Sequence, residues 1–432
     1  MRKLMLLRFI LTVIVFVFTC TQGQFTNASS LQSEAEASRA TSDILKQAPK
    51  VYIDCDRCDM DYIRTEITFV SYVRDSKDAQ VYVLITTQST GSSGREYNLS
   101  FSGQKEFEGV NNEFKYFSNN TDTSDEVREG LVKFLKIGLV SYAARTSVAD
   151  MISVSFESEE IESVEKEDKW DYWVFSISGR GFIDGEKMSD AYSLSGSFSA
   201  NRITPDFKFR SSYSTSKSED NFYLSSGTFK STSRSKNFNL LAVKSLTDHW
   251  SAGVGLSAYS STYSNMDYAF KPAPALEYNF FPYSESTRRQ LRFLWKPGFN
   301  MYKYNEETIY NKTSENMWGQ SLSITFEMKE KWGNIGASLQ GFHYFNDLQK
   351  NNLRLNADVS IRLFRGLSFN IYGGFRRIRD QISLPKGGAS LEEVLLRQTQ
   401  LATGYSYYGS IGLSYSFGSI YSNIVNPRFS GY

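Results

Sequence analysis

From residue 170 to the end of the chain, apolar and polar residues alternate with a period of two. In the clearest run, Leu353, Leu355, Ala357, Val359, Ile361 and Leu363 alternate with Arg354, Asn356, Asp358, Ser360 and Arg362. Because successive side chains of a strand point to opposite faces, this pattern predicts long strands with one apolar and one polar face. Lipid-spanning strands need this alternation, and their edges must close into a barrel because hydrocarbon offers no hydrogen-bond partners.

About twelve such strands are predicted, an even number as in single-chain bacterial barrels. Their centres lie near residues 176, 195, 210, 239, 255, 275, 297, 322, 338, 358, 371 and 411. Short turns are predicted at 203–205, 246–248, 283–285, 329–331 and 365–366, and longer loops at 183–189, 216–230, 305–315 and 380–403. Pro272 and Pro274 would remove ladder donors in mid-strand, which predicts a bulge there.

The residues before this region show a mixed pattern. Short strands are predicted at 51–53, 68–73, 80–87, 95–102 and 113–118, with a helix at 59–67. A capping box at Thr123–Glu126 opens a second helix, which runs to Ala144. Residues 46–155 therefore form a predicted α+β domain, between a linker at 25–45 and a charged linker at 156–169. The barrel domain is assigned to residues 170–432.

The first 24 residues have the pattern of a secretory signal peptide. Arg2 and Lys3 precede a largely apolar stretch from Leu4 to Phe18, followed by small and polar residues. A retained membrane helix needs about 20 apolar residues, more than this stretch contains. A lipid anchor on Cys20 is the weaker alternative, because Thr19 fits such a site poorly. Since periplasmic turns are the shorter set, an exported chain of this kind would keep residues 46–155 in the periplasm.

Composition excludes one class of partner. The chain has 48 Lys and Arg residues against 47 Asp and Glu residues, a formal charge of +1. Without a concentrated basic surface, it has no general electrostatic reason to bind nucleic acid. Aromatic residues make up 15% of the chain, which suits strands with one apolar face.

Cys55 and Cys58 are the two cysteines outside the signal segment. A structural disulfide between them is favoured in an oxidising compartment. The alternatives are a redox CxxC motif, which lacks the following βαβ pattern, and half of a zinc site, which lacks a second ligand pair.

Charged residues of inward parity are the second candidate group. They are Lys208, Arg210, Arg292, Arg354, Arg362 and Arg376, with Glu277, Glu327 and Asp358 as acidic counterparts. They form either an anion-attracting lumen or ion pairs that fill a narrow barrel, and the second reading is favoured. A capping box at Ser390–Glu393 predicts a helix through Leu401 that covers the mouth of the barrel.

Catalysis has little support in the sequence. A barrel lipase or protease would need a general base, and the chain offers His249 in a turn and His343 in an aromatic segment. An aromatic girdle explains His343 without chemistry. We therefore expect no enzyme activity, no cofactor and no metal.

Three segments carry a resemblance to a known family. Residues 125–131, 281–290 and 409–415 resemble a family of uncharacterised Gram-negative envelope proteins, and the barrel is more distantly similar to salt-induced outer-membrane proteins. Residues 411–418 resemble the closing strand that the outer-membrane insertion machinery recognises, followed by an extra tail at 419–432. The resemblance implies location and fold, and it brings no site residues.

These observations predict an outer-membrane β-barrel with a structural or transport role. The expected partners are the lipid bilayer, the insertion machinery and a periplasmic protein. One alternative is an envelope assembly or secretion partner that acts through the periplasmic domain. The other is a lipid-modifying barrel enzyme.

Overall fold

The structure is a computed structural model that describes residues 47–91, 94–153, 155, 169–224, 227–387, 402–423, 425, 426 and 428. The predicted signal peptide, the first linker, residues 156–168 of the charged linker and the predicted loop helix lie outside the described residues. Within the described part of the chain, no helix is both long and apolar enough to span a membrane.

The N-terminal α+β region contains a five-stranded sheet and two α-helices. Its elements are β1 (Lys50–Asp54), α3 (Met60–Glu66), β2 (Ser71–Tyr72), β3 (Val81–Ser89), β4 (Arg95–Gly103), η1 (Lys105–Phe107), β5 (Asn111–Ser118), α4 (Ser124–Ala143) and η2 (Ala149–Met151). The strand order is β2-β1-β3-β4-β5, in which β1 runs parallel to β2 and β3.

Helix α4 packs its apolar side on one face of this sheet. The Thr123 and Glu126 side chains form the predicted capping box at its start. Leu135, Leu139 and Tyr142 are fully buried. Gly138 allows close packing, because a Cβ at this position would lie 2.2 Å from the Phe101 ring. The helices therefore cover one face of the sheet, and its other face is free to meet the rest of the molecule.

The remaining strands form one large antiparallel sheet. They are β6 (Trp173–Glu186), β7 (Ser189–Ile203), β8 (Phe207–Leu224), β9 (Gly227–Ser245), β10 (Trp250–Ser261), β11 (Met266–Asn279), β12 (Arg289–Tyr304), β13 (Ser314–Glu330), β14 (Gly333–Tyr344), β15 (Asn351–Phe364), β16 (Leu367–Ile378) and β17 (Tyr405–Tyr415). Each strand pairs with its sequence neighbours, so the order runs from β6 to β17 without a crossover. The predicted fold class is confirmed: the protein is mainly β, with twelve antiparallel strands after a small α+β region.

The connections lie at two ends of the large sheet. The end here called the turn end carries the short turns after β7, β9, β13 and β15, together with the connection 280–288 after β11, which contains η3 (Tyr283–Glu285). The opposite end, here called the loop end, carries the long connections 305–313 and 379–404. The long loops predicted at 183–189 and 216–230 are wrong. There β6 continues to Glu186, and β8 reaches Leu224 before β9 begins at Gly227, because these polar residues keep pairing across extended hairpins.

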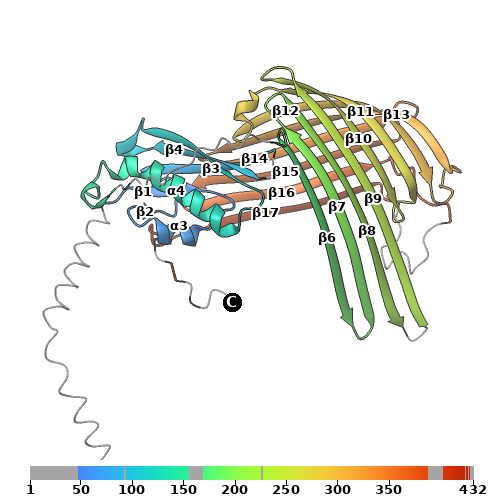
Figure 1. The fold of residues 1–432 in the computed structure, drawn as a ribbon, viewed down its shortest axis with the longest axis horizontal. Coiled ribbons are helices and arrows are strands. Elements are labelled where there is room, and N and C mark those ends of the chain that lie inside the picture. The colour runs from blue at the N-terminus through green and yellow to red at the C-terminus, as the bar shows by residue number, and fades with distance from the viewer. Residues whose placement is uncertain are drawn as a thin grey trace, which may run out of the picture.

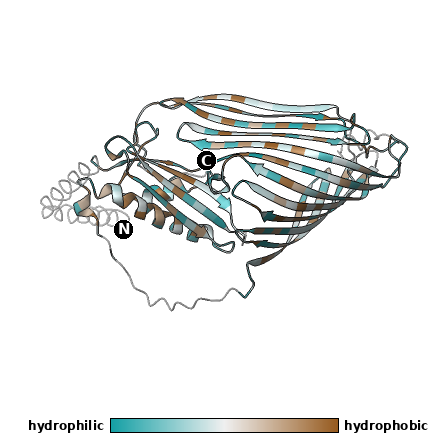
Figure 2. Ribbon diagram, turned by 90° about the horizontal axis from the view of Figure 1, so that it is seen from above, coloured by the Kyte–Doolittle hydropathy of each residue, from teal (hydrophilic) through white to brown (hydrophobic). Residues whose placement is uncertain are grey.

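Cross-strand pairing aligns the alternating side chains into rows. Phe293, Ile324, Leu339, Leu355, Phe375 and Tyr407 are successive partners across six strands. The row on the opposite face consists of Leu294, Ser323, Gln340, Arg354, Arg376 and Ser406. One face is thus apolar along much of the sheet and the other is largely polar. Figure 2 shows the alternation of hydrophobic and hydrophilic residues along the strands.

The large sheet curves strongly, but its two edges do not meet in the described residues. The sheet order begins at β17 and ends at β6, with no ladder between them. Figure 1 shows β6 to β9 diverging from β14 to β17. The strand count and order agree with the predicted barrel, whereas closure is not seen.

No bulge lies at the two prolines of β11, contrary to the expectation. Pro272 and Pro274 keep their register with Leu256 and Val254 of β10. On the other side, the ladder to β12 is interrupted between Phe270 and Leu276 and resumes in the same register. The missing proline N–H groups therefore remove bonds on one side only, without inserting a residue.

The N-terminal region lies at the turn end of the large sheet (Figure 1). The chain after β17 returns to this region and joins its edge strand. Val73 forms an antiparallel bridge with Tyr421. Arg74 N donates to Ile420 O at 3.0 Å and Ser422 N donates to Tyr72 O at 2.9 Å. This described part of the C-terminal tail therefore covers the β2 edge, which would otherwise expose unpaired backbone groups.

Candidate functional site

Charged side chains gather at two places. The first is the contact between the N-terminal region and the turn end, where Tyr52, Asp54, Tyr82 and Arg362 form what is here called the docking cluster. The second is a cavity on the concave, polar face of the large sheet, here called the concave cavity.

Arg362 is the centre of the docking cluster. Its Nη1 lies 3.0 Å from Asp54 Oδ2, and its Nη2 donates to Tyr52 Oη at 2.8 Å. Nη1 also donates to the Lys331 carbonyl at 3.1 Å. The guanidinium carbon lies 4.9 Å from the centre of the Tyr52 ring. One planar group thus contacts a carboxylate, a hydroxyl and an aromatic face, an arrangement that suits the rigid, planar fork of a guanidinium better than a lysine ammonium.

Strand pairing explains how the cluster is assembled. Tyr52 of β1 is the register partner of Tyr82 of β3, and their rings stack with centroids 5.9 Å apart. Asp54 is two residues after Tyr52, so it lies on the same face of the small sheet. That face is the one α4 leaves uncovered. Arg362 lies near the end of β15, at the turn end of the large sheet.

Burial keeps the two tyrosines of the cluster protonated. It raises the pKa of Tyr82, and the neighbouring Asp54 carboxylate raises it further. Burial also raises the pKa of Tyr52, against the opposing effect of the Arg362 charge. Tyr82 Oη therefore acts as a donor, at 2.5 Å from Asp54 Oδ2. Asp54 accepts from both Tyr82 and Arg362, which satisfies a half-buried carboxylate.

Three further contacts extend this interface. Asp75 Oδ2 accepts from Gly366 N at 2.5 Å in the β15–β16 turn, where φ is +75° at the glycine. Arg365 pairs with Asp78 at 3.0 Å, and Lys329 lies 3.8 Å from Asp56. Cys55 and Cys58 are joined in a disulfide directly after Asp54, so the predicted pair constrains the backbone next to the docking cluster.

A cavity of about 840 Å³ lies beside the docking cluster. Its walls come from the uncovered face of the small sheet and from the turns after β11 and β13. The lining includes Glu96, Glu113 and Lys115 on one side and Arg288, Arg289 and Glu330 on the other. The interface is therefore polar and open beside the cluster, not a packed apolar contact.

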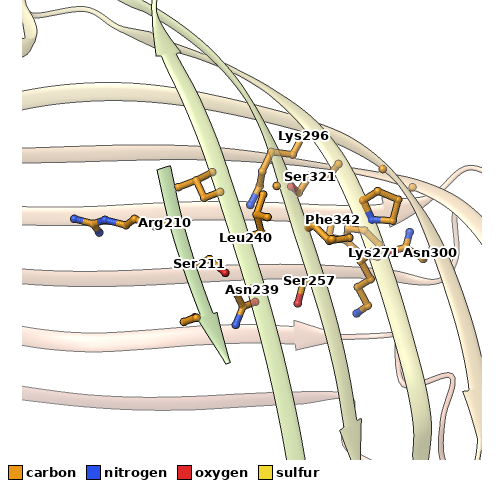
Figure 3. A pocket seen from close by; sticks show the side chains of 18 of the residues that line it. Arg210, Ser211, Asn239, Leu240, Ser257, Lys271, Lys296, Asn300, Ser321 and Phe342 are labelled. Carbon is orange, nitrogen blue, oxygen red and sulfur yellow. The ribbon is translucent and has the colours of Figure 1, made fainter. Parts of the chain in front are cut away.

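The concave cavity has a volume of about 510 Å³. It is lined by residues from β7 to β14, and Figure 3 shows Arg210, Lys271, Lys296 and Asn300 around it. Its lining contains no aspartate or glutamate. Lys271 Nζ lies 4.8 Å from the centre of the Tyr259 ring and 5.1 Å from that of Tyr302.

The loop end of the concave face is filled by a buried apolar cluster. Its members are Met266, Ala269, Tyr302, Tyr304, Met317, Tyr344 and Ile382. Ile382 comes from the last long loop. That loop is held by Asn265 Nδ2, which donates to Ser383 O at 2.9 Å, and by Ile309 N, which donates to Leu384 O at 2.9 Å. The described part of the loop thus folds inward; the predicted helix lies beyond it, outside the described residues.

The predicted lumen charges do not form one site. Arg210 lines the concave cavity. Lys208 interacts electrostatically with Arg210 and Glu277. Arg292 pairs with Glu277 at 3.7 Å. The other sheet charges split into two groups. Arg354 and Arg376 are direct register partners, whereas Glu327 and Asp358 line a separate cavity of about 180 Å³. Arg362 pairs with the N-terminal region.

The sequence reasoning missed two sets of residues. Lys271 and Lys296 have the same parity as Glu277 and Arg292 on their strands, so the alternation itself could have identified them. No alternation pattern in the sequence identifies Tyr52, Asp54 and Tyr82 as functional residues. Their role depends on where the N-terminal region docks, which the spacing of residues does not encode.

The two histidines occupy the positions of structural side chains. His249 Nδ1 lies 2.8 Å from the Asn279 carbonyl, and His343 Nε2 lies 2.9 Å from Gln320 Nε2. His343 and Gln320 are register partners on the outer face. Among the described residues, no group of three His, Cys, Asp or Glu side chains is placed to hold a metal ion.

Comparisons with known proteins add little. No family model and no curated protein matches the chain, so the resemblance to an envelope family stays a prediction. Among solved structures, the NanC porin matches at 12% sequence identity and a TM-score of 0.29, over 56% of this chain and 99% of the porin chain. A TM-score this low supports no argument about function.

We predict that Arg362→Ala weakens docking of the N-terminal region and exposes the β15–β16 turn. Hydrogen exchange at the Gly366 amide, which is bonded to Asp75, measures this in the full-length protein. Asp54→Ala should give a similar increase, and the double variant should add little to either. The coupling should be about 1–3 kcal/mol, as for a hydrogen bond between charged groups.

Arg377→Ala is the control, because Arg377 lies near the opposite end of the sheet, on β16. Unchanged exchange at Gly366 in Arg362→Ala, or fully additive effects of the two substitutions, would show that the pair does not hold the interface.

Proposed function

We propose that the protein is an outer-membrane β-barrel whose periplasmic mouth is covered by its own N-terminal region. Its role in this proposal is regulated transport across the outer membrane. The observation that carries the proposal is the division of the large sheet into an apolar convex face and a polar concave face, with the N-terminal region bound at the turn end.

The convex face supports a membrane location. Its rows of apolar partners run across adjacent strands, and large side chains such as Leu355, Phe375 and Leu413 are exposed to solvent. Exposed apolar surface on this scale is unusual for a soluble monomer and marks a contact with lipid or protein. An alternating face that is apolar across most strands is what the hydrocarbon of a bilayer requires.

Closure of the sheet is part of the proposal. Ile177 of β6 is 84% exposed and Ile411 of β17 is 75% exposed, and both strands leave one edge unpaired in the described structure. Because β6 begins and β17 ends at the turn end, the two edges run antiparallel. Each unpaired backbone group in hydrocarbon costs on the order of several kcal/mol. Pairing of β6 with β17 is therefore favoured in the membrane.

Because short turns are the periplasmic set in outer-membrane barrels, the proposal assigns the turn end and the docked region to the periplasm. Both ends of the interior are then covered, one by the N-terminal region and the other by the last long loop. The docking pair is suited to reversible release. The Arg362 and Asp54 side chains keep 26% and 23% exposure, so water can replace the lost contacts.

A catalytic role is not part of the proposal. On the lipid-facing side, the His343 ring contacts the Gln320 amide, the Tyr344 carbonyl and the Phe345 ring, and none of these groups is a nucleophile or an acid. The role of an assembly partner remains the second candidate, because the polar cavity beside the docking cluster offers a surface to a periplasmic protein.

We predict that a charge on the convex face destabilises the membrane-inserted protein and that the same charge on the concave face does not. Leu355→Arg should lower the free energy of unfolding by about 2–4 kcal/mol if it lies near the bilayer midplane. Asn356→Arg is the matched control, since it is the next residue and points to the polar side. Urea unfolding in liposomes, followed by tryptophan fluorescence, measures both; equal losses would contradict the assigned lipid face.

We predict that the full chain is silent in planar bilayers because both mouths are covered. Deletion of residues 25–165 together with loop 380–403 should give steady conductance, whereas each single deletion should leave one cover in place. Arg362→Ala in the loop-deleted chain should raise the open fraction without removing any backbone.

Steady conductance by the intact chain would contradict the covered mouth and indicate an open pore. Silence of the doubly deleted chain, shown to be inserted by its heat-modifiable migration on gels, would contradict transport. Crosslinking from the N-terminal region would then identify a protein partner.

A further inference from the structure

We infer that the concave cavity binds a small organic anion with two or more carboxylate or phosphate groups. This inference deepens the proposed function, because it names the class of solute for which the interior is built.

The charge of the cavity lining is the first argument. Arg210, Lys271 and Lys296 contribute to it, and none of the three forms an ion pair with a residue in the described ranges. Asp380 of the last loop acts on Lys271 with an opposite charge, but its Oδ1 already accepts from Asn352 at 3.0 Å. The chain as a whole has nearly equal numbers of cations and acids. A lining with cations alone is therefore a local feature, and it calls for a counter-charge from solution.

The position of Lys271 is the second argument. Its Nζ lies 3.4 Å from Tyr259 Oη and faces the Tyr259 and Tyr302 rings. Tyr302 is buried, and its hydroxyl is bonded to that of Tyr344 at 2.9 Å. These rings restrict where the ammonium group can lie. A cation held in place before binding loses less side-chain entropy when a ligand arrives.

Neutral polar groups complete the lining. Asn201, Asn239, Ser212 and Ser257 contribute to the cavity, and they can donate to and accept from hydroxyl groups of an organic anion. A volume of about 510 Å³ falls within the usual range for small-molecule sites. An inorganic ion alone would leave most of this space and most of these groups to water.

The location of the cavity gives binding a role. The buried apolar cluster lies between the cavity and the loop end of the sheet. The ion pair of Glu277 with Arg292 lies between the cavity and the turn end. A solute that crosses the interior along the concave face must pass the three cations. Anions would then be concentrated there, and cations would be opposed.

Equilibrium dialysis of the full-length protein in detergent micelles tests this inference, with citrate and 2-phosphoglycerate as probes. Trehalose is the neutral probe. We expect at least one of the two anions to bind and trehalose not to bind. Lys271→Met and Lys296→Met should each weaken binding about tenfold, as loss of one charge-assisted contact does. Lys236→Met is the control, because this exposed β9 residue lies on the other face.

Failure of both anions to bind, equal binding of trehalose, or an equal loss in Lys236→Met would overturn the inference. Insertion into liposomes, checked for each variant by heat-modifiable migration on gels, shows that a loss of binding is not a loss of folding. The outcomes remain separable from those of the proposed function. A protein that inserts and conducts when uncovered, but does not bind either anion, contradicts only the anion site. A protein that binds the anion but never inserts contradicts only the membrane role.

Discussion

Alternation of side chains along continuous hydrogen-bonded strands is the constraint on which the rest of the structure depends. Ten of the twelve strands pair on both sides, so most of their backbone groups need no other partner, apart from the gap beside Pro272 and Pro274. The side chains can then differ completely between the faces. The convex face carries rows such as Ile324, Leu339 and Leu355, and the concave face carries serines, asparagines and charges. A shift of one residue in any register would exchange the two faces. Register and function are therefore specified together.

The N-terminal region is attached to this sheet by contacts from distant parts of the chain. Arg362 and Gly366 come from one hairpin of the large sheet, and Tyr421 comes from the C-terminal tail. None of these contacts is a large apolar interface. They are hydrogen bonds and ion pairs with partial exposure to water, each worth at most about 1–3 kcal/mol. Such an attachment positions the region without making its release prohibitive.

The sequence predicted most of the fold because the relevant signals are local. Each predicted strand centre lies within an observed strand of the large sheet, although β8 extends much further past its predicted centre than expected. The capping box at Thr123 and Glu126 begins α4 as expected. Errors occurred where local signals are ambiguous. Polar residues at 183–189 and 216–230 suggested loops, but in a hairpin that extends past the apolar belt such residues continue the strands. The bulge expected at Pro272 was replaced by a one-sided gap in the ladder.

The candidate sites were less predictable. The alternation of side chains predicted that Arg210, Arg354 and Arg376 lie on the inner face. It could not show that Arg362, which has the same parity, forms an ion pair with Asp54 of the N-terminal region. The partner lies 308 residues away in the chain, and only the position of the N-terminal region against the large sheet brings the two side chains together. The concave cavity was partly predictable from the sequence. Its residues have the right parity, but their concentration in one wall depends on the curvature of the sheet.

The position of the N-terminal region over the turn end is the central claim, and a disulfide trap tests it most directly. A Cβ placed on Gly91 would lie 2.8 Å from the Cβ of Ile203 at the end of β7, so an outward shift of about 1 Å gives the Cβ separation of a disulfide. The chain with Gly91→Cys and Ile203→Cys should therefore crosslink spontaneously when it is exported. Lys133→Cys on the exposed side of α4, paired with Ile203→Cys, should not. Absence of the Gly91–Ile203 crosslink, or equal crosslinking from Lys133, would contradict a docked N-terminal region.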